Sequence, residues 1–426
     1  MVSLLLRTLP VVAVACLLSP VPALCQQVDD RISVAADDWP WWRGPNRNGV
    51  ANAGEQPPTE WSATKNVAWK TPVPGRGHSS PIVVGPRVFL ATADEDADTQ
   101  SVLCYDRATG EPVWQAQVHS GGIMRKHERS TGASGSVACD GENVYVLFAN
   151  SGAVYLTALS VEGEQLWQTK LADYKIHQGY GASPAVYRSL VIASADSHAG
   201  GVVAGLDRKT GKTVWQHDRP EQPNYTSPII LNVAGRDQLL MTGCDRFLSL
   251  DPMTGETLWE TPGTTTECVT STVTDGKRIF STGGYPKSHV SAAMADGSGE
   301  IAWETKDRVY VPSILVKDGH LFAVMDAGIA VCWQSDTGEE KWKKRLGGTF
   351  SASPVLVGDL IYATNDDGET FIYRADPTKY DQLAQNQLGD SVMGSSAICG
   401  DRIYMRLVEK VDGKRQEMLY CVAEEK

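Results

Sequence analysis

The most constraining feature of the sequence is a short pattern that recurs along most of its length. The fullest copies read Asp-x-x-Thr-Gly-x-x-x-Trp and span residues 106–114, 207–215 and 251–259. Asp favours the start of a turn, Gly supplies the positive φ that closes it, and Trp begins a new extended run. With the degenerate copies, the tryptophans recur roughly every 40–50 residues: Trp69, Trp114, Trp167, Trp215, Trp259, Trp303 and Trp342. A further copy begins at Asp376 but has lost its tryptophan.

A second pattern shares this period. It is a short apolar strand led by Ser or Pro, then a turn, then a β-branched or aromatic strand. Eight copies occur, at residues 79–93, 135–149, 182–195, 226–243, 271–283, 311–326, 351–366 and 394–407. Each repeat therefore contains four antiparallel strands, which is typical of a β-propeller blade. We predict an all-β fold, an eight-bladed β-propeller.

The two ends of the repeat region predict how the ring closes. The eighth repeat has a third strand near residues 418–422, and then the chain ends without an outer strand. Residues 66–71 form an outer strand that has no earlier strands of its own. We therefore expect the N-terminal strand to complete the C-terminal blade, which hides the sheet edges. The propeller domain is predicted to span residues 66–426.

Two segments precede the propeller. Residues 1–25 combine Arg7, an apolar stretch and small residues before a polar run, which is typical of a cleaved signal peptide. Lipoprotein anchoring at Cys16 or Cys25 is a weaker interpretation, because Leu is missing three residues before each. Residues 26–65 form a lead-in rich in Trp, Pro and Gly, which we expect to pack on the propeller as a plug or clasp. No later stretch is long and apolar enough to span a membrane.

Composition narrows the function classes further. A net charge of −12 disfavours nucleic-acid binding, which depends on neutralising phosphates. Seven of the nine cysteines follow the signal peptide, and none forms a CxxC pair. We expect them to be small buried side chains, with a single disulfide as the alternative in an exported protein. We expect the protein to be a monomer in the periplasm or cell envelope.

The Asp-x-x-Thr-Gly-x-x-x-Trp pattern resembles the tryptophan-docking motif of the quinoprotein, or PQQ-like, eight-bladed propellers. That superfamily includes PQQ-dependent alcohol dehydrogenases and the outer-membrane assembly factor BamB. The chain as a whole is similar to PQQ-like repeat proteins abundant in planctomycete-type bacteria, which often begin with a segment like Trp42-Arg43-Gly44-Pro45. The resemblance implies that each repeat tryptophan packs against the neighbouring blade with its N–H group bonded.

The resemblance also raises the question of redox chemistry. PQQ alcohol dehydrogenases stack the cofactor under an adjacent Cys-Cys disulfide and hold Ca²⁺ beside it. This chain has neither an adjacent cysteine pair nor a CxxCH motif. We therefore predict no catalytic residue and no cofactor, with PQQ and Ca²⁺ as the alternative. The acidic run Asp94–Asp98 is interpreted as a surface turn rather than a Ca²⁺ site, and no metal site is predicted.

The remaining place for function is the mouth of the ring, formed by the loops that precede the innermost strands. These loops mix basic and aromatic residues and also contain Glu267, Arg308, Phe350 and Met393. The candidate ligand-binding residues are Arg76, His78, Lys126, His127, Arg129, Tyr180, Tyr225 and Tyr310. Such a set suits a partner peptide or envelope protein, a sugar, or an anionic small ligand. The predicted function is a non-catalytic, BamB-like binding or scaffold module, with a PQQ-dependent oxidoreductase or a carbohydrate-binding propeller as alternatives.

Overall fold

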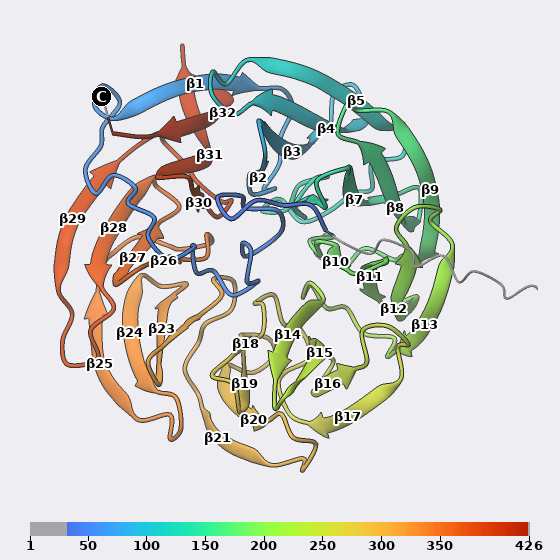
Figure 1. Ribbon diagram of the computed structural model, residues 1–426, viewed down its shortest axis with the longest axis vertical. Helices are drawn as coiled ribbons and strands as arrows, with labels where there is room; N and C mark the ends of the chain where they lie inside the picture. Colours follow the sequence, from blue (N-terminus) through green and yellow to red (C-terminus); the bar gives the residue numbers. More distant parts are fainter. Residues whose placement is uncertain (1–31, 425–426) are drawn as a thin grey trace, which may run out of the picture. The chain divides into compact units, whose positions relative to one another are not determined.

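The computed structural model describes residues 32–424, so the predicted signal peptide at residues 1–25 lies outside the described part. Within residues 32–424, the regular secondary structure consists of strands, which form eight four-stranded antiparallel sheets. The sheets follow one another around a central axis like the blades of a propeller (Figure 1). The predicted all-β, eight-bladed fold is confirmed.

In each blade the chain runs from the innermost to the outermost strand. The first four blades are β2 (Ile82–Val84), β3 (Arg87–Asp94), β4 (Thr99–Asp106) and β5 (Pro112–Ser120); β6 (Ala138–Cys139), β7 (Asn143–Asn150), β8 (Ala153–Ser160) and β9 (Gln165–Asp173); β10 (Ala185–Tyr187), β11 (Leu190–Ser197), β12 (Gly200–Asp207) and β13 (Thr213–Arg219); and β14 (Ile229–Val233), β15 (Arg236–Gly243), β16 (Arg246–Leu250) and β17 (Thr257–Pro262).

The last four blades complete the circle, and only the outermost strand of the eighth comes from the start of the chain. They are β18 (Val273–Thr274), β19 (Arg278–Gly283), β20 (His289–Met294) and β21 (Ile301–Thr305); β22 (Leu315–Lys317), β23 (His320–Met325), β24 (Ile329–Gln334) and β25 (Glu340–Arg345); β26 (Val355–Val357), β27 (Leu360–Thr364), β28 (Glu369–Arg374) and β29 (Gln382–Gln387); and β30 (Ala397–Cys399), β31 (Arg402–Val411), β32 (Lys414–Val422) and β1 (Val67–Val73).

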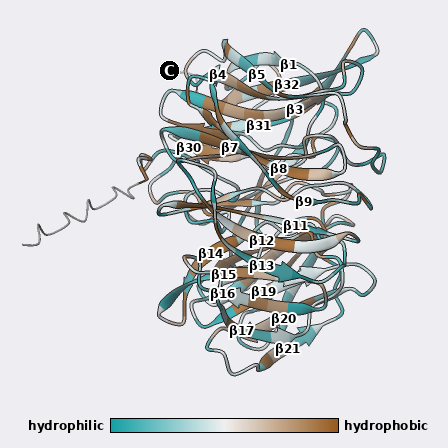
Figure 2. Ribbon diagram, turned by 90° about the vertical axis from the view of Figure 1, so that its right-hand side faces the viewer, coloured by the Kyte–Doolittle hydropathy of each residue, from teal (hydrophilic) through white to brown (hydrophobic). Residues whose placement is uncertain are grey.

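The burial of the strands follows from their place in the blade. Middle strands such as β7 and β11 are buried along nearly their whole length, because neighbouring blades cover both of their faces. The outer strands β5 and β9 lie at the rim and are mostly exposed or half-buried. Figure 2 shows the consequence from the side, with hydrophobic residues concentrated on strands such as β7 and β8 and hydrophilic ones on the connecting loops.

The ring is closed by the two ends of the described chain. β1 is the outermost strand of the eighth blade and pairs antiparallel with β32, with Trp69 opposite Cys421. Strands from residues 67–73 and 414–422 therefore share one sheet, and the eighth blade has its full complement of four strands.

A β-bulge precedes the tryptophan position in the outer strand of every blade. In blade 3 the register shifts between Gly205 and Leu206. Gly205 pairs with Trp215 and Leu206 with Thr213, while Val214 between them is unpaired and 57% exposed. Equivalent shifts occur in the other seven blades. A bulge re-aims the side chain that follows it, which explains why the tryptophans face sideways towards the next blade.

Most of the repeat tryptophans contact the next blade through their indole N–H group. Five of the seven donate to one of its backbone carbonyls: Trp69 to Arg107, Trp114 to Val161, Trp167 to Arg208, Trp303 to Ser335 and Trp342 to Asp376. Trp259 donates to Gln238 of its own blade instead, and the indole N–H of Trp215 has no partner among the described residues. The motif glycine makes room for the ring: a Cβ atom on Gly211 would lie 2.5 Å from Trp167.

Blade 7 lacks its tryptophan, and the lead-in places another one there. Ala384 of β29 occupies the tryptophan position. Trp61 of the lead-in stacks on Tyr362 with 6.5 Å between ring centroids, as Trp69 packs on Tyr404 in blade 8 at 6.0 Å. Tyr362 and Tyr404 hold the same place, because each pairs with the first residue of its blade's innermost strand. Trp61 therefore fills a place that the repeat itself leaves empty.

The lead-in makes a similar substitution where blade 8 meets blade 1. Between blades 2 and 3, Arg208 forms a buried ion pair with Asp140 at 2.7 Å. The equivalent residues at the closure are Arg107 and Cys399, and a cysteine offers no carboxylate. Asp38 of the lead-in, 1% exposed, accepts hydrogen bonds from Arg107 at 3.5 Å and from the Gly85 amide at 2.8 Å.

The lead-in also crosses the middle of the ring (Figure 1). Its hydrogen bonds to residues in or next to the innermost strands reach Val83, Cys139, Val186, Ser271, Ile314 and Leu356. Trp39 pairs with β2 through two backbone hydrogen bonds with Val83, and Trp41 is 6% exposed. Among the described residues, no helix is long and apolar enough to cross a membrane.

Candidate functional site

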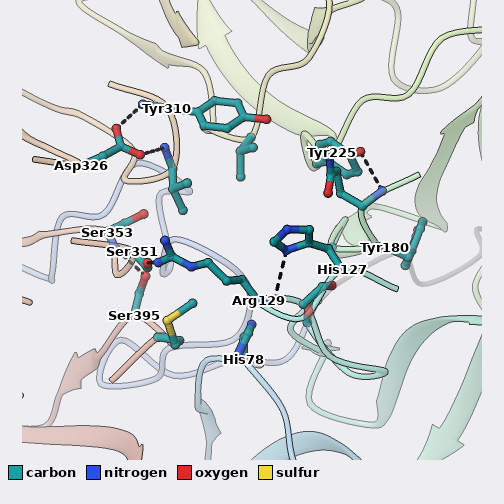
Figure 3. A pocket seen from close by; sticks show the side chains of 18 of the residues that line it. His78, His127, Arg129, Tyr180, Tyr225, Tyr310, Asp326, Ser351, Ser353 and Ser395 are labelled. Atoms are coloured by element: carbon teal, nitrogen blue, oxygen red, sulfur yellow. Dashed lines mark hydrogen bonds between the residues drawn. The ribbon is translucent and has the colours of Figure 1, made fainter. Parts of the chain in front are cut away.

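The mouth of the ring opens into a central cavity of about 690 Å³, which we call the cup. It is lined by the loops that precede the innermost strands, where the sequence predicted a ligand site (Figure 3). Six of the eight predicted residues line it: His78, His127, Arg129, Tyr180, Tyr225 and Tyr310. The other two, Arg76 and Lys126, line an adjoining pocket of about 480 Å³ formed by the loop at residues 121–130.

The lead-in forms the floor of the cup. Trp42 lines the cavity and donates its indole N–H to Ser271 Oγ at 2.7 Å. Directly after it, Arg43 is 3% exposed and donates to the carbonyls of Ile314 and Pro354 at 2.8 and 3.0 Å. Burial lowers the pKa of Arg43 to about 9, because its neighbours are carbonyls rather than carboxylates. A positive charge therefore lies beside the floor of the cup at neutral pH.

A belt of eight serines, one from each blade, surrounds the axis at the level of the cup. Each is 1–7% exposed, and the members are Ser80, Ser136, Ser183, Ser227, Ser271, Ser313, Ser353 and Ser395. Seven backbone N–H groups along the belt donate to the Oγ of the next serine at 2.8–3.0 Å. At the eighth junction, Ser271 Oγ instead accepts a hydrogen bond from the indole N–H of Trp42. The belt thus ties the innermost strands to one another.

Removing one belt hydroxyl should destabilise the ring. Ser183→Ala deletes the acceptor of the Ser136 N–H and leaves this buried donor unpaired. We expect a loss of about 1–3 kcal/mol in the free energy of unfolding, measured by urea denaturation. Ser396→Ala, which changes a half-buried serine beside the belt, is the control and should have a smaller effect. Equal effects of the two changes would show that the belt hydrogen bonds contribute little.

The charged residues of the cup differ in whether they already have partners. Arg129 reaches across the mouth and donates to Asp366 at 3.0 Å, while Arg308 makes no ion pair among the described residues. Arg308 lies 5.1 Å from the centroid of the Tyr310 ring and donates to a backbone carbonyl. Burial raises the pKa of Glu267, which lies 3.4 Å from His177. The cup therefore contains one arginine that is available to an anion.

His78 at the mouth contributes little charge at neutral pH. Burial, followed by the nearby guanidinium groups of Arg406 and Arg76, lowers the pKa of His78 to about 3. His78 is therefore neutral and can act as a hydrogen-bonding group rather than a cation.

The contact between Arg129 and Asp366 should open on acidification. Burial raises the pKa of Asp366, although hydrogen bonds from Ser351 and the charge of Arg129 oppose this shift. Since the raised pKa means that the folded state binds this proton more tightly, Asp366 should become protonated at a higher pH than an ordinary aspartate. Its protonation adds to stability as the pH falls but removes the partner of Arg129.

We therefore expect the protection of backbone amides in the loop at residues 121–135, corrected for the intrinsic pH dependence of exchange, to fall as Asp366 is protonated, which carboxyl NMR can follow. Asp366→Asn should show this lower protection at every pH. Titration of Asp366 at or below the ordinary aspartate range would contradict this expectation.

The structure also shows what the sequence did not identify. His177, Asp326 and six serines of the belt line the cup without having been predicted as site residues. The acidic run forms a turn in which Asp94 accepts two backbone hydrogen bonds, and no metal-binding group of three or more His, Cys, Asp or Glu occurs among the described residues. All seven cysteines of the described part are free and buried, and burial was the expectation for them.

Comparison with known proteins gives relatives of two kinds. The family model described as outer membrane protein assembly factor BamB matches residues 53–195, 98–286 and 286–409. The assembly factor BamB of Burkholderia pseudomallei is 26% identical over 330 residues, which cover 70% of this chain and 76% of that protein. BamB from Moraxella catarrhalis has a TM-score of 0.59 at 17% identity, covering 84% of this chain and 97% of that one. A europium-containing methanol dehydrogenase has a TM-score of 0.66 at 12% identity, covering 91% and 98%; both structures show a shared fold.

Proposed function

Since this chain belongs to the family of the outer membrane protein assembly factor BamB, we propose that it is an exported, non-catalytic propeller that binds a partner protein in the cell envelope. The observation that carries the proposal is the cup with its surrounding loops, in which the residues that vary between repeats converge. Tryptophans and motif glycines lie instead in the contacts between blades. Recognition is therefore assigned to the mouth and stability to the repeated motif.

The mouth has the chemistry of a protein-binding surface. Arg129 is 57% exposed at its side chain, and Tyr285 at the rim is 56% exposed. Arginine and tyrosine are the residue types that contribute most to protein interfaces, because they combine a large contact area with directional hydrogen bonds. The mouth also lies on loops, where a rigid scaffold can hold variable contact residues.

Affinity capture from envelope extracts tests this proposal. The wild-type protein is compared with Arg129→Gln/Arg308→Gln at the mouth and with the control Arg236→Gln. Arg236 is the exposed first residue of β15, next to the turn that follows β14, at the other end of an innermost strand. We expect the mouth variant to lose a partner that the wild type and the control retain. Capture of the same partners by all three proteins would contradict the assignment to the mouth.

The alternative function is a PQQ-dependent oxidoreductase, which the methanol dehydrogenase fold makes worth testing. The donor set does not fit this cofactor. The sequence has no adjacent cysteines to cover it, and the described residues include no group of three or more His, Cys, Asp or Glu that could hold its metal ion. Dye-linked alcohol oxidation after addition of PQQ and Ca²⁺ would favour this alternative.

A further inference from the structure

We propose that the cup is a binding site for a small acidic sugar of the hexuronate class. The inference rests on the proposed binding role of the mouth and adds a ligand at its base. Three features of the cup carry it: a set of hydrogen-bond donors, a single unpaired cation and a wall of aromatic rings.

The donors come from the serine belt. Six of its members line the cavity: Ser80, Ser136, Ser183, Ser227, Ser353 and Ser395. The Oγ of each accepts the backbone N–H of a neighbouring belt serine, and none donates its own O–H to an acceptor among the described residues. A hydroxyl whose oxygen already accepts a bond still has a proton to donate. Several buried O–H groups around one space therefore favour a ligand rich in oxygen acceptors.

The cation indicates one negative charge on that ligand. Within residues 32–424, Arg129 and Arg308 are the only Lys or Arg residues that line the cup, and Arg129 is paired with Asp366. Arg308 has no ion pair in this part of the chain, and its planar guanidinium suits a carboxylate. Glu267 and Asp326 also line the cup, which disfavours a ligand of higher negative charge. Their carboxylates can instead accept hydroxyl protons of a sugar.

The aromatic wall favours a small molecule with apolar C–H faces. Tyr180, Tyr225, Tyr310 and Phe350 line the cup above Trp42. Tyr180 donates its hydroxyl to the Ser194 carbonyl at 2.7 Å, so it contributes the ring rather than the polar end. The cup is of the size typical of small-molecule sites, and Trp42 of the lead-in also lines it.

Isothermal titration of the full mature chain with D-glucuronate and D-galacturonate tests the proposal, with D-glucose and acetate as comparison ligands. At least one hexuronate should bind at least tenfold more tightly than glucose and acetate, because glucose lacks the carboxylate and acetate lacks the sugar hydroxyl groups. Arg308→Gln should weaken hexuronate binding at least tenfold, and Arg236→Gln should leave it unchanged. If Arg308→Gln does not fold, Arg308→Lys replaces it and should also weaken binding, because it keeps the charge without the planar fork.

Several results would overturn the proposal. They are no binding of either hexuronate at millimolar concentration, equal binding of glucose, or hexuronate binding that Arg308→Gln leaves unchanged. Binding of an acidic peptide without binding of a hexuronate would also overturn it, since the occupant would then be a polypeptide end. None of these results changes the envelope-capture experiment, so failure of the ligand assignment can be distinguished from failure of the proposed function.

Discussion

Trp61→Ala is expected to lower the free energy of unfolding by about 3–5 kcal/mol, as for other truncations of buried aromatic side chains. Trp61 is 4% exposed and packs on Tyr362 at the junction of blades 7 and 8. Blade 7 has only Ala384 where other blades have tryptophan, so nothing in the repeat can compensate for the loss. Urea denaturation followed by tryptophan fluorescence measures the effect.

The control for this prediction is Trp61→Phe. The indole N–H of Trp61 has no partner among the described residues, so a phenyl ring keeps the stacking on Tyr362 without losing a hydrogen bond. The loss should therefore be clearly smaller than for alanine. An unfolding midpoint for Trp61→Ala equal to that of the wild type would show that the lead-in does not stabilise this junction.

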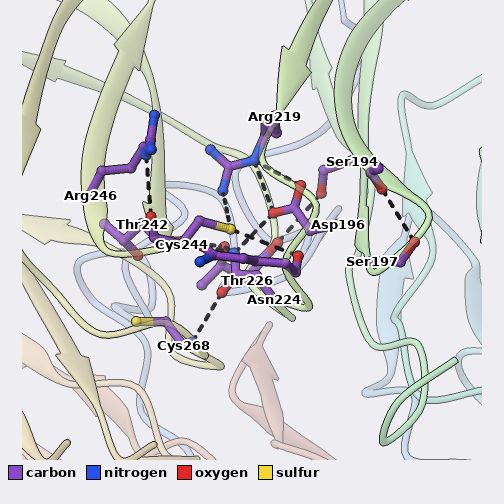
Figure 4. A network of polar contacts seen from close by, with 12 residues as sticks. Ser194, Asp196, Ser197, Arg219, Asn224, Thr226, Thr242, Cys244, Arg246 and Cys268 are labelled. Atoms are coloured by element: carbon purple, nitrogen blue, oxygen red, sulfur yellow. Dashed lines mark hydrogen bonds and ion pairs between the residues drawn. The ribbon is translucent and has the colours of Figure 1, made fainter. Parts of the chain in front are cut away.

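Asp196→Ala is expected to cost a similar amount, about 3–5 kcal/mol, because it leaves a buried cation without its partner. Both side chains of the Asp196–Arg219 pair are 1% exposed, and their closest contacts are 2.8 and 2.9 Å (Figure 4). Asn224 donates to Asp196 at 3.1 Å and to the Thr242 carbonyl at 2.9 Å, which joins blades 3 and 4. The measurement is again the free energy of unfolding.

The same substitution should loosen the wall of the cup. Tyr225 follows Asn224 directly and donates its backbone N–H to the Cys268 carbonyl at 3.0 Å, while Asn224 accepts the Cys268 N–H at 3.0 Å. Hydrogen exchange in residues 222–228 should therefore accelerate. Asp173→Ala, which removes one partner of an exposed ion pair, is the control and should change little. If Asp196→Ala were as mild as this control, the network would contribute little to stability.

Much of the fold can be predicted from the sequence because the same repeat occurs many times along the chain. The period of the tryptophans predicts blades, and the Ser- or Pro-led strands give their number. What the repeat cannot predict is a residue that acts outside it. Trp61 has no motif around it, and its role depends on the absence of a tryptophan at Ala384, more than three hundred residues away. Asp38 is similar, since its role depends on Cys399 replacing an aspartate.

The candidate site is predictable in place but less so in content. The loops before the innermost strands converge in any propeller, and Tyr225 and Tyr310 of these loops line the cup. Arg76 and Lys126 lie in loops of the same kind but line the adjoining pocket instead. The serine belt was visible as a recurring first residue of a strand. Its hydrogen bonds connect neighbouring blades, so they can be recognised only when the blades are placed side by side in the closed ring.

The most direct test of the central claim, that recognition occurs at the mouth, is photo-crosslinking from one defined position on each end of the propeller. A photoreactive phenylalanine derivative replaces Tyr225 in the cup or Arg236 on the opposite end, and living cells that contain the protein are irradiated. We predict a discrete adduct with a partner protein from position 225 and none from position 236. Adducts from position 236 alone would contradict the claim.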